Sequence, residues 1–284
     1  MFFSAEAVMP HITRIYSVAD TMMYLVEGSE RAVLVDTGCG IGDLYEFVRG
    51  LTDKPISVLL THGHVDHALG AWGFDAVYLN PLDRDVYLAH SRREVQRSYA
   101  SALPAEAWGP FDAPSDDDWR DPLLYEQFRP MYPGDVFELG GISAVITEGA
   151  GHTPGCVTIL FPELRVLLLG DACNEFTFLF EQYSSSVADY RDMLVRLKKD
   201  TDGAYDRVLF LHRSGEGDVN MVSNVIDVCD DILNGRADNI PFESFIGNNG
   251  VIAKEMDWQS GRCDGKSGNI VYDPKKLTVK GGSA

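Results

Sequence analysis

The stretch LLTHGHVDHALGAW, residues 59–72, decides how the rest of the chain is interpreted. It gathers His62, His64, Asp66 and His67 directly after an apolar segment that is typical of a buried strand. Residues two apart in an extended or turning backbone project to the same side, so His62 and His64 can bind one metal ion. Asp66 and His67 lie on the turn that starts the next helix, from which they can reach a second ion. Because imidazole and carboxylate suit Zn²⁺ and similar divalent ions, the stretch predicts a metal site.

Three later strands each lead into one further metal-binding residue. These residues are His152 after 142–150, Asp171 after 165–169 and His212 after 207–211. Rigid strands hold side chains while loops leave room for substrate, so sites often gather at strand ends. The chain thus offers enough ligands for two divalent ions, for which we expect Zn²⁺, with Fe or Mn as alternatives. The other histidines, His11 and His90, follow no apolar strand and are not predicted to be ligands. Gly63 is expected to leave the backbone free to bend between His62 and His64.

The predicted elements alternate between strands and helices, which indicates a mixed α/β protein. Strands are predicted over 11–18, 21–28, 31–38, 56–62, 76–79, 136–139, 142–150, 156–161, 165–172, 207–212 and 269–273. Helices are predicted over 42–51, from about residue 81, over 185–200 and over 219–235. Residues 101–134 are rich in prolines and acids and predict an irregular insertion. We expect this insertion to border the metal site as a lid, and a plain surface excursion is the alternative.

The segment THGHVDHALG, residues 61–70, resembles the HxHxDH motif of the metallo-β-lactamase superfamily. Further landmarks stand in that family's order: VLVDTG (33–38), GHTPG (151–155), LLLGDA (167–172) and FLH (210–212). The resemblance covers about residues 11–215. It implies a single metallo-β-lactamase domain over 1–284, folded as a four-layer αββα sandwich with the metals at one edge between the sheets.

The same resemblance implies a role for each candidate ligand. It assigns His62, His64 and His152 to the first metal, Asp66, His67 and His212 to the second, and Asp171 to a bridge between the two. Asp36 would support the ligands without binding a metal itself. A turn-capping aspartate is the other interpretation of Asp36, and it is compatible with that role.

Two divalent ions close together lower the pKa of a shared water toward neutrality. We expect the resulting metal-bridging hydroxide to attack an electrophilic centre, with Asp66 as the catalytic residue that orients it and moves its proton. The predicted function is a dinuclear metal-dependent hydrolase of a small ester, lactone or thioester. The alternatives are a phosphodiesterase or nuclease of the same superfamily, an iron-dependent persulfide dioxygenase-like enzyme, and a non-catalytic metal-stabilised binding module.

Asp171 resembles the bridging aspartate of the glyoxalase II and lactonase branches, which true β-lactamases lack. Asn174 stands where acyl-homoserine lactonases carry a tyrosine, and no clear counterpart of the glutathione-binding basic residues of glyoxalase II is visible. The substrate within that branch is therefore left open.

Aromatic residues on either side of the landmarks have two interpretations. Phe176, Phe178, Phe180 and Trp108 could line an apolar pocket, and a place in the core is the favoured alternative. Cys173 is expected to be an inert buried thiol.

The chain is strongly acidic, with a formal net charge of -19. Such a surface repels phosphate backbones and anionic membranes, so we expect a small-molecule substrate, and neither nucleic acid nor a membrane as a partner. The five cysteines are dispersed without a CxxC pair, and the N-terminus lacks the pattern of a signal peptide. Both features favour a cytoplasmic location. The sequence sets no oligomeric state and is compatible with a homodimer.

Overall fold

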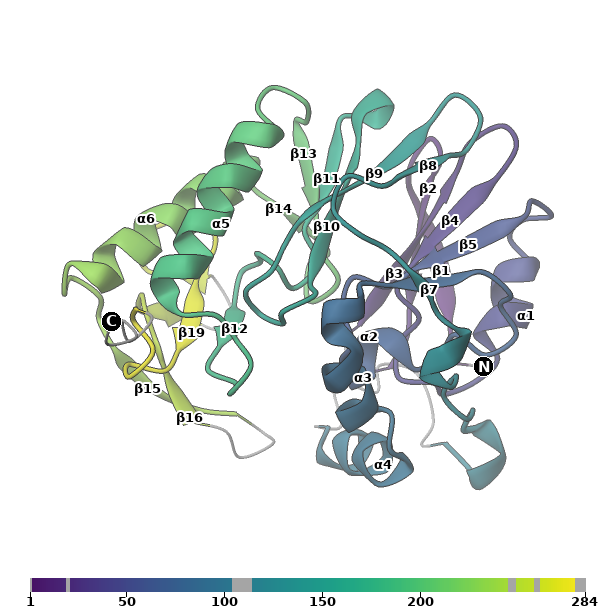
Figure 1. Ribbon diagram of the computed structural model, residues 1–284, viewed down its shortest axis with the longest axis horizontal. Coiled ribbons are helices and arrows are strands. Elements are labelled where there is room, and N and C mark those ends of the chain that lie inside the picture. The colour runs from purple at the N-terminus through teal and green to yellow at the C-terminus, as the bar shows by residue number, and fades with distance from the viewer. Residues whose placement is uncertain (1, 19–20, 104–113, 245–248, 258–260, 279–284) are drawn as a thin grey trace. The chain divides into compact units, whose positions relative to one another are not determined.

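The computed structural model describes residues 2–18, 21–103, 114–244, 249–257 and 261–278 (Figure 1). The chain forms two compact parts, and it passes from one to the other more than once along its length. The first part comprises Met1–Ile146, Phe161–Leu164 and Leu211–Gly215, and the second comprises Thr147–Leu160, Arg165–Phe210 and Glu216–Ala284. The single domain expected over 1–284 stays a prediction.

A seven-stranded sheet forms the centre of the first part, with its strands in the order β1-β2-β3-β4-β5-β6-β7. Strands β1 to β4 pair antiparallel, and β4 to β7 pair parallel. The strands are β1 (Ser4–Met9), β2 (Ile12–Tyr16), β3 (Met22–Glu27), β4 (Ala32–Val35), β5 (Ile56–Leu59), β6 (Val77–Leu79) and β7 (Arg129–Pro130). Strand β8 (Val136–Glu138) follows and pairs antiparallel with the start of β9 (Ser143–Glu148).

Helices cover one face of the seven-stranded sheet. They are α1 (Leu44–Arg49), α2 (Val65–Ala68), α3 (Arg84–His90) and α4 (Arg93–Ala102), with 3₁₀ turns at η1 (Pro81–Asp83), η3 (Asp116–Asp118) and η4 (Tyr125–Gln127). Side chains alternate between the two faces of a strand, so Leu25, Leu34 and Val58 share a face. They pack in one apolar cluster with Val48 of α1 and Val65 of α2. Helix α1 therefore follows the apolar spacing that predicted it.

The ends of the parallel strands β4 and β5 bring two loops together at one edge of the sheet. The amide and the hydroxyl of Thr37, after β4, donate to the carbonyl of His67 at 2.7 and 3.0 Å. The amide of Gly70 in turn donates to the Thr37 hydroxyl at 3.1 Å. These hydrogen bonds hold the HxHxDH segment, residues 62–67, against the loop that contains Asp36.

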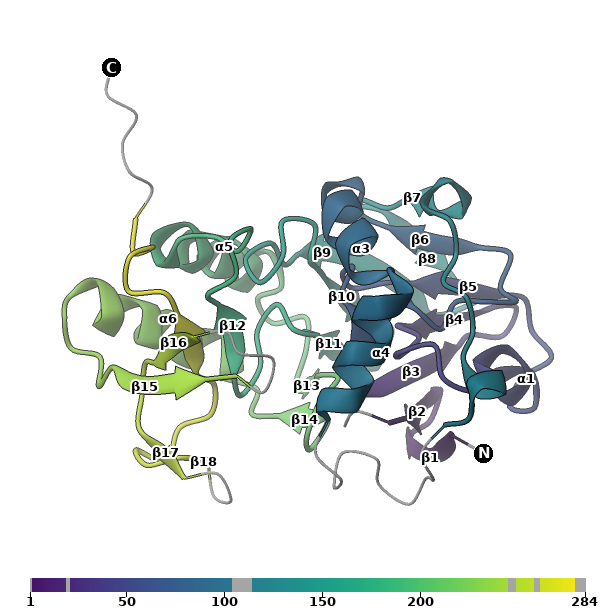
Figure 2. The ribbon, with the colours of Figure 1, turned by 90° about the horizontal axis from the view of Figure 1, so that it is seen from below.

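The described residues of the second part contribute to two larger sheets and one two-stranded sheet, and they form two long helices. Strands β10 (Val157–Phe161), β11 (Val166–Leu168), β13 (Arg207–Leu209) and β14 (Glu216–Gly217) lie in the order β14-β13-β11-β10. A four-stranded sheet has the order β12-β19-β16-β15, from β12 (Thr177–Leu179), β15 (Ile240–Glu243), β16 (Asn249–Ile252) and β19 (Ile270–Tyr272). Helices α5 (Val187–Asp200) and α6 (Met221–Leu233) lie side by side along one face of this sheet (Figures 1 and 2). A short pair, β17 (Met256–Asp257) and β18 (Gly261–Arg262), and the 3₁₀ turn η5 (Pro162–Leu164), which belongs to the first part, complete the elements.

The predicted mixed α/β class is confirmed, and most predicted elements are present. Two differences from the prediction concern segments near the candidate site. Strand β5 ends at Leu59, so His62 stands in a loop and not on the strand. The described residues of the predicted insertion, 101–103 and 114–134, contain the end of α4, two 3₁₀ turns and the short strand β7, and they are otherwise irregular. Within the described ranges, no helix is both long enough and apolar enough to cross a membrane.

Candidate metal centre

Asp36 is the buried support of the candidate site in the first part. It is fully buried, and its φ of 59° is a left-handed conformation that aspartate adopts more readily than most residues. Its Oδ1 accepts from the amide of Thr61 at 2.6 Å. Its Oδ2 accepts from the Thr61 hydroxyl at 2.6 Å and lies 2.7 Å from Nδ1 of His67. Both carboxylate oxygens of Asp36 thus accept hydrogen bonds from Thr61 or His67.

These contacts also set the tautomers of His62 and His67. The Thr61 hydroxyl gives its one proton to Asp36, so its oxygen accepts from Nδ1 of His62 at 3.0 Å. Nδ1–H of His67 donates to the Asp36 carboxylate. Each assigned tautomer leaves Nε2 with the lone pair that a metal ion requires.

Asp66, His67 and His212 form a triangle of potential ligand atoms. Nε2 of His67 lies 3.1 Å from Nε2 of His212, and Oδ2 of Asp66 lies 3.6 and 3.7 Å from these two nitrogens. Zn²⁺ with ligands at its ordinary bond lengths separates tetrahedral neighbours by about 3.3 Å. The triangle therefore has the size and the donor atoms that one divalent ion needs.

The segment that carries His212 belongs to the first part. Strand β13 ends at Leu209. Two residues further on, the carbonyl of Leu211 accepts a hydrogen bond from the amide of Met22, and His212 forms an antiparallel β-bridge with Thr21. His212 is thereby held at the start of β3, next to Asp66 and His67 of helix α2.

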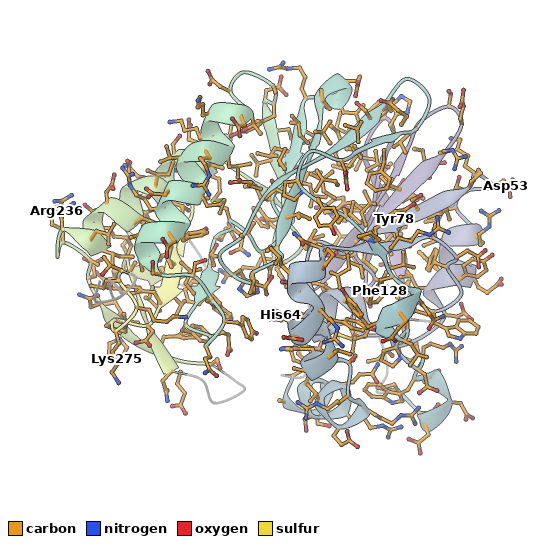
Figure 3. All side chains as sticks on the ribbon, viewed as in Figure 1. Asp53, His64, Tyr78, Phe128, Arg236 and Lys275 are labelled. Atoms are coloured by element: carbon orange, nitrogen blue, oxygen red, sulfur yellow. The ribbon has the colours of Figure 1, made fainter. Side chains whose placement is uncertain are left out.

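His64 precedes the first residue of α2 and contacts His90, which was not predicted to be a ligand. Its ring lies 4.6 Å from the ring of His62, edge to face, and stacks on the ring of His90 at 4.5 Å. Figure 3 shows His64 beside α3, the helix that ends at His90. The sequence prediction set His90 aside because it follows no apolar strand, and its contact with His64 depends on the packing of α3.

Gly63 is required for a different reason than the one expected. It does not have a positive φ, and its amide donates to the buried carboxylate of Asp83 at 2.8 Å. A Cβ at this position would lie 2.9 Å from the amide nitrogen of Tyr87 and 3.1 Å from the carbonyl oxygen of Asp83. The glycine thus permits close approach of α3 to the histidine loop, and the free bending expected from the sequence is not its role.

Tyr99 on α4 is a further contact that the sequence prediction did not find. Its hydroxyl donates to Oδ2 of Asp66 at 3.0 Å. A tyrosine on a helix has no motif of its own, so only the fold reveals this bond.

His152 and Asp171 lie close together in the second part. Nδ1 of His152 donates to the carbonyl of Phe178 at 2.8 Å, which leaves Nε2 for a metal ion. This Nε2 is 3.9 Å from Oδ2 of Asp171, and the side-chain amide of Asn174 donates to the other oxygen of Asp171 at 3.3 Å. The second part therefore also presents an imidazole and a carboxylate that fit a divalent ion.

A profile of the metallo-beta-lactamase superfamily matches residues 17–205, which include most of the landmarks described above. The chain belongs to the metallo-β-lactamase superfamily.

Curated relatives of this superfamily member include two vertebrate enzymes named acyl-coenzyme A thioesterase MBLAC2. The Bos taurus protein is 25% identical over 208 residues, which cover 66% of this chain and 71% of that protein. The Gallus gallus protein is 26% identical over 208 residues, which cover 66% of this chain and 70% of that protein. Among solved structures, a metallo-beta-lactamase from Pontibacter korlensis matches with a TM-score of 0.56 and 17% identity, over 81% of this chain and 99% of that chain. The metallo-β-lactamase fold predicted from the HxHxDH motif is confirmed.

Cys173 lies near the candidate ligands of this metallo-β-lactamase fold but is not activated. It is fully buried, and burial raises the pKa of its thiol to about 12. The thiolate, which is the nucleophile and metal ligand, is therefore scarce at neutral pH. The expected burial of this thiol is confirmed, and its inertness stays a prediction.

Proposed function

We propose that the protein is a dinuclear metal-dependent hydrolase that cleaves a small acyl thioester, with esters and lactones as related substrates. The observation that carries this proposal is the triangle of Asp66, His67 and His212, whose ligand atoms are spaced for one divalent ion. The relatives named acyl-coenzyme A thioesterase favour a thioester among the acyl substrates. The bridging position proposed for Asp171 supports the glyoxalase II or lactonase-like branch over true β-lactamases.

We propose that two ions are held by the residues that the family motifs assign. His62, His64 and His152 would bind the first, Asp66, His67 and His212 the second, and Asp171 both. The donor chemistry supports this set, because each of His62, His67 and His152 has its Nδ1 engaged by an oxygen, and the resulting tautomer gives Nε2 the lone pair that a metal ligand needs. Imidazole and carboxylate donors favour Zn²⁺, with Fe or Mn as alternatives.

Bound divalent ions would supply acidified water and polarise the acyl carbonyl. In this proposal Asp66 accepts the proton of the attacking water and returns one to the leaving sulfur or oxygen, a general acid–base role. The hydroxyl of Tyr99 holds one oxygen of Asp66, so the carboxylate keeps one orientation during that transfer. Asp36 keeps His67 aligned through its charge-assisted bond to Nδ1.

A lid role for 101–134 remains part of the proposal. Its support comes from residues within the first part: Tyr99, just before the insertion, contacts Asp66, and the amide of Arg120 donates to the carbonyl of Gly40 at 2.9 Å. Trp108 lies outside the described residues. We also keep a cytoplasmic location and a small-molecule substrate as proposals. The five cysteines, all free thiols, are compatible with a reducing compartment.

The test is a substrate panel combined with metal analysis. Protein purified without added metal should contain about two ions per chain, and it should cleave an acyl thioester faster than a generic phosphodiester or a persulfide. Asp66→Ala should lower the rate at least about 100-fold while the fold remains. Asp53→Ala, at a fully exposed carboxylate in the same part, is the matched control. Cleavage of only the phosphodiester, or oxygen uptake with a persulfide, would replace this proposal with the corresponding alternative.

A further inference from the structure

Four phenylalanines gather on one face of the four-stranded sheet in the second part. They are Phe178 on β12, Phe176 and Phe180 directly before and after that strand, and Phe242 on β15. The ring centroid of Phe178 lies 5.5 Å from that of Phe176, 4.9 Å from that of Phe180 and 5.7 Å from that of Phe242. All four side chains are partly exposed, whereas core phenylalanines such as Phe161 are fully buried. We call this set the aromatic face.

The aromatic face is turned away from helix α5. Side chains alternate along a strand, so Thr177 and Leu179 point to the opposite face of the sheet, where both are almost fully buried. Thr177 interacts there with Tyr190 of α5. The core interpretation therefore holds for the residues between the phenylalanines, and not for the phenylalanines themselves.

The sheet leaves room for the rings to meet. Phe242 pairs in register with Gly250 of the neighbouring strand. A Cβ on Gly250 would lie 3.3 Å from Cδ1 of Phe180 and 3.0 Å from Cγ1 of Val271. Because this position has no side chain, the rings of Phe180 and Phe242 come within 6.3 Å of each other across it.

Phe178 links the aromatic face to the candidate ligands of the same part. Its main-chain carbonyl accepts from Nδ1 of His152, whose Nε2 lies 3.9 Å from Asp171. The residue that orients a predicted ligand thus also supplies the central ring of the face. The aromatic face and the predicted ligand His152 are therefore joined through one residue, Phe178.

We infer that the aromatic face binds the apolar acyl chain of the substrate and makes the enzyme selective for medium and long acyl chains. This inference rests on the proposed function and specifies its substrate. The rings from β12 and β15 meet in one apolar surface, and a longer acyl chain can bury more methylenes against it. Aromatic rings bury methylenes favourably, and an uncharged chain is not repelled by a protein of net charge -19.

The test compares acetyl, butyryl, octanoyl and dodecanoyl thioesters of one thiol. The wild-type kcat/KM should rise at least about tenfold from acetyl to octanoyl. Phe242→Ala removes a ring on β15, a different strand from the Phe178 carbonyl that binds His152, and it should reduce this preference about tenfold, mainly through KM. Phe242→Leu should reduce the chain-length preference by a smaller factor, and it replaces the alanine variant in the test if that variant does not fold. Val195→Ala removes an exposed apolar side chain on α5, outside the face, and should leave the preference unchanged.

A binding measurement separates this inference from the proposed function. Dodecanoate should bind the metal-free wild-type protein in calorimetry, and Phe242→Ala should weaken that binding about tenfold. If no thioester is cleaved but this binding difference is found, the proposed function fails and the acyl site stands. Cleavage with a flat chain-length profile in both proteins overturns the inference. So does a wild-type dimer that Phe242→Glu converts to monomers with an unchanged profile, because the face is then an interface between copies.

Discussion

At the scale of single residues, Asp36 determines whether His67 can act as a metal ligand. The carboxylate accepts from Thr61 and His67 in a buried position. Asp36→Asn keeps the size and tolerates the left-handed backbone, but its amide group faces donors and cannot accept all three bonds. We expect metal affinity to fall about 10- to 100-fold. Competition with a chromophoric chelator measures this change.

The control for that variant is Asp53→Asn, since Asp53 is fully exposed at the tip of a loop (Figure 3). Its metal affinity should equal that of the wild type. An Asp36→Asn protein that binds metal as tightly as the wild type would show that Asp36 only caps the turn after β4.

Gly63 gives a second prediction at the same scale. In Gly63→Ala the new methyl group would press on the backbone of α3 at Tyr87 and Asp83, and backbone atoms there cannot move aside cheaply. We expect a loss of about 2 kcal/mol in the free energy of unfolding. Urea denaturation measures it, and Gly50→Ala, at a helix end with ordinary φ, should change stability by less than about 1 kcal/mol. Equal free energies of unfolding for Gly63→Ala and Gly50→Ala would show that the close packing of α3 does not require a glycine at position 63.

At the scale of elements, helix α4 contributes to the site through Tyr99. In Tyr99→Phe the carboxylate of Asp66 loses one hydrogen bond and its restrained orientation. We expect kcat to fall about tenfold while KM and metal content stay unchanged. Tyr16→Phe removes another phenol–carboxylate bond, to the exposed Glu6, and should leave kcat unaffected. A loss of metal in Tyr99→Phe would instead give Tyr99 a role in ligand binding.

The same helix shows where prediction from sequence ends. Strands β2 to β5 and helices α5 and α6 have clear apolar periods, and the hydroxyl of Ser186 caps α5 by accepting from the amide of Asp189. Helix α4 was not predicted as a separate helix, because the sequence prediction placed one helix of unstated length from about residue 81 and then an insertion from residue 101. The contacts of His90 with His64 and of Tyr99 with Asp66 depend on how helices pack, and no local pattern encodes them. Strand β12 was missed because NEFTFLF was considered only as pocket or core, and its alternation was not interpreted as a strand.

At the scale of the whole molecule, the proposed ligands are distributed over both compact parts of the chain. Metal ions that bind the folded chain and not the unfolded chain stabilise it by mass action. Removing them with a chelator should therefore lower the melting temperature by about 5–10 °C and abolish hydrolysis, and adding Zn²⁺ should restore both. Differential scanning calorimetry measures the shift. His152→Ala should retain about one ion per chain and show a smaller shift, whereas His11→Ala, at a histidine outside the predicted ligand set, should behave as the wild type. A chelated protein that melts at the same temperature as the loaded one would argue that the histidines and aspartates are held by their hydrogen bonds alone.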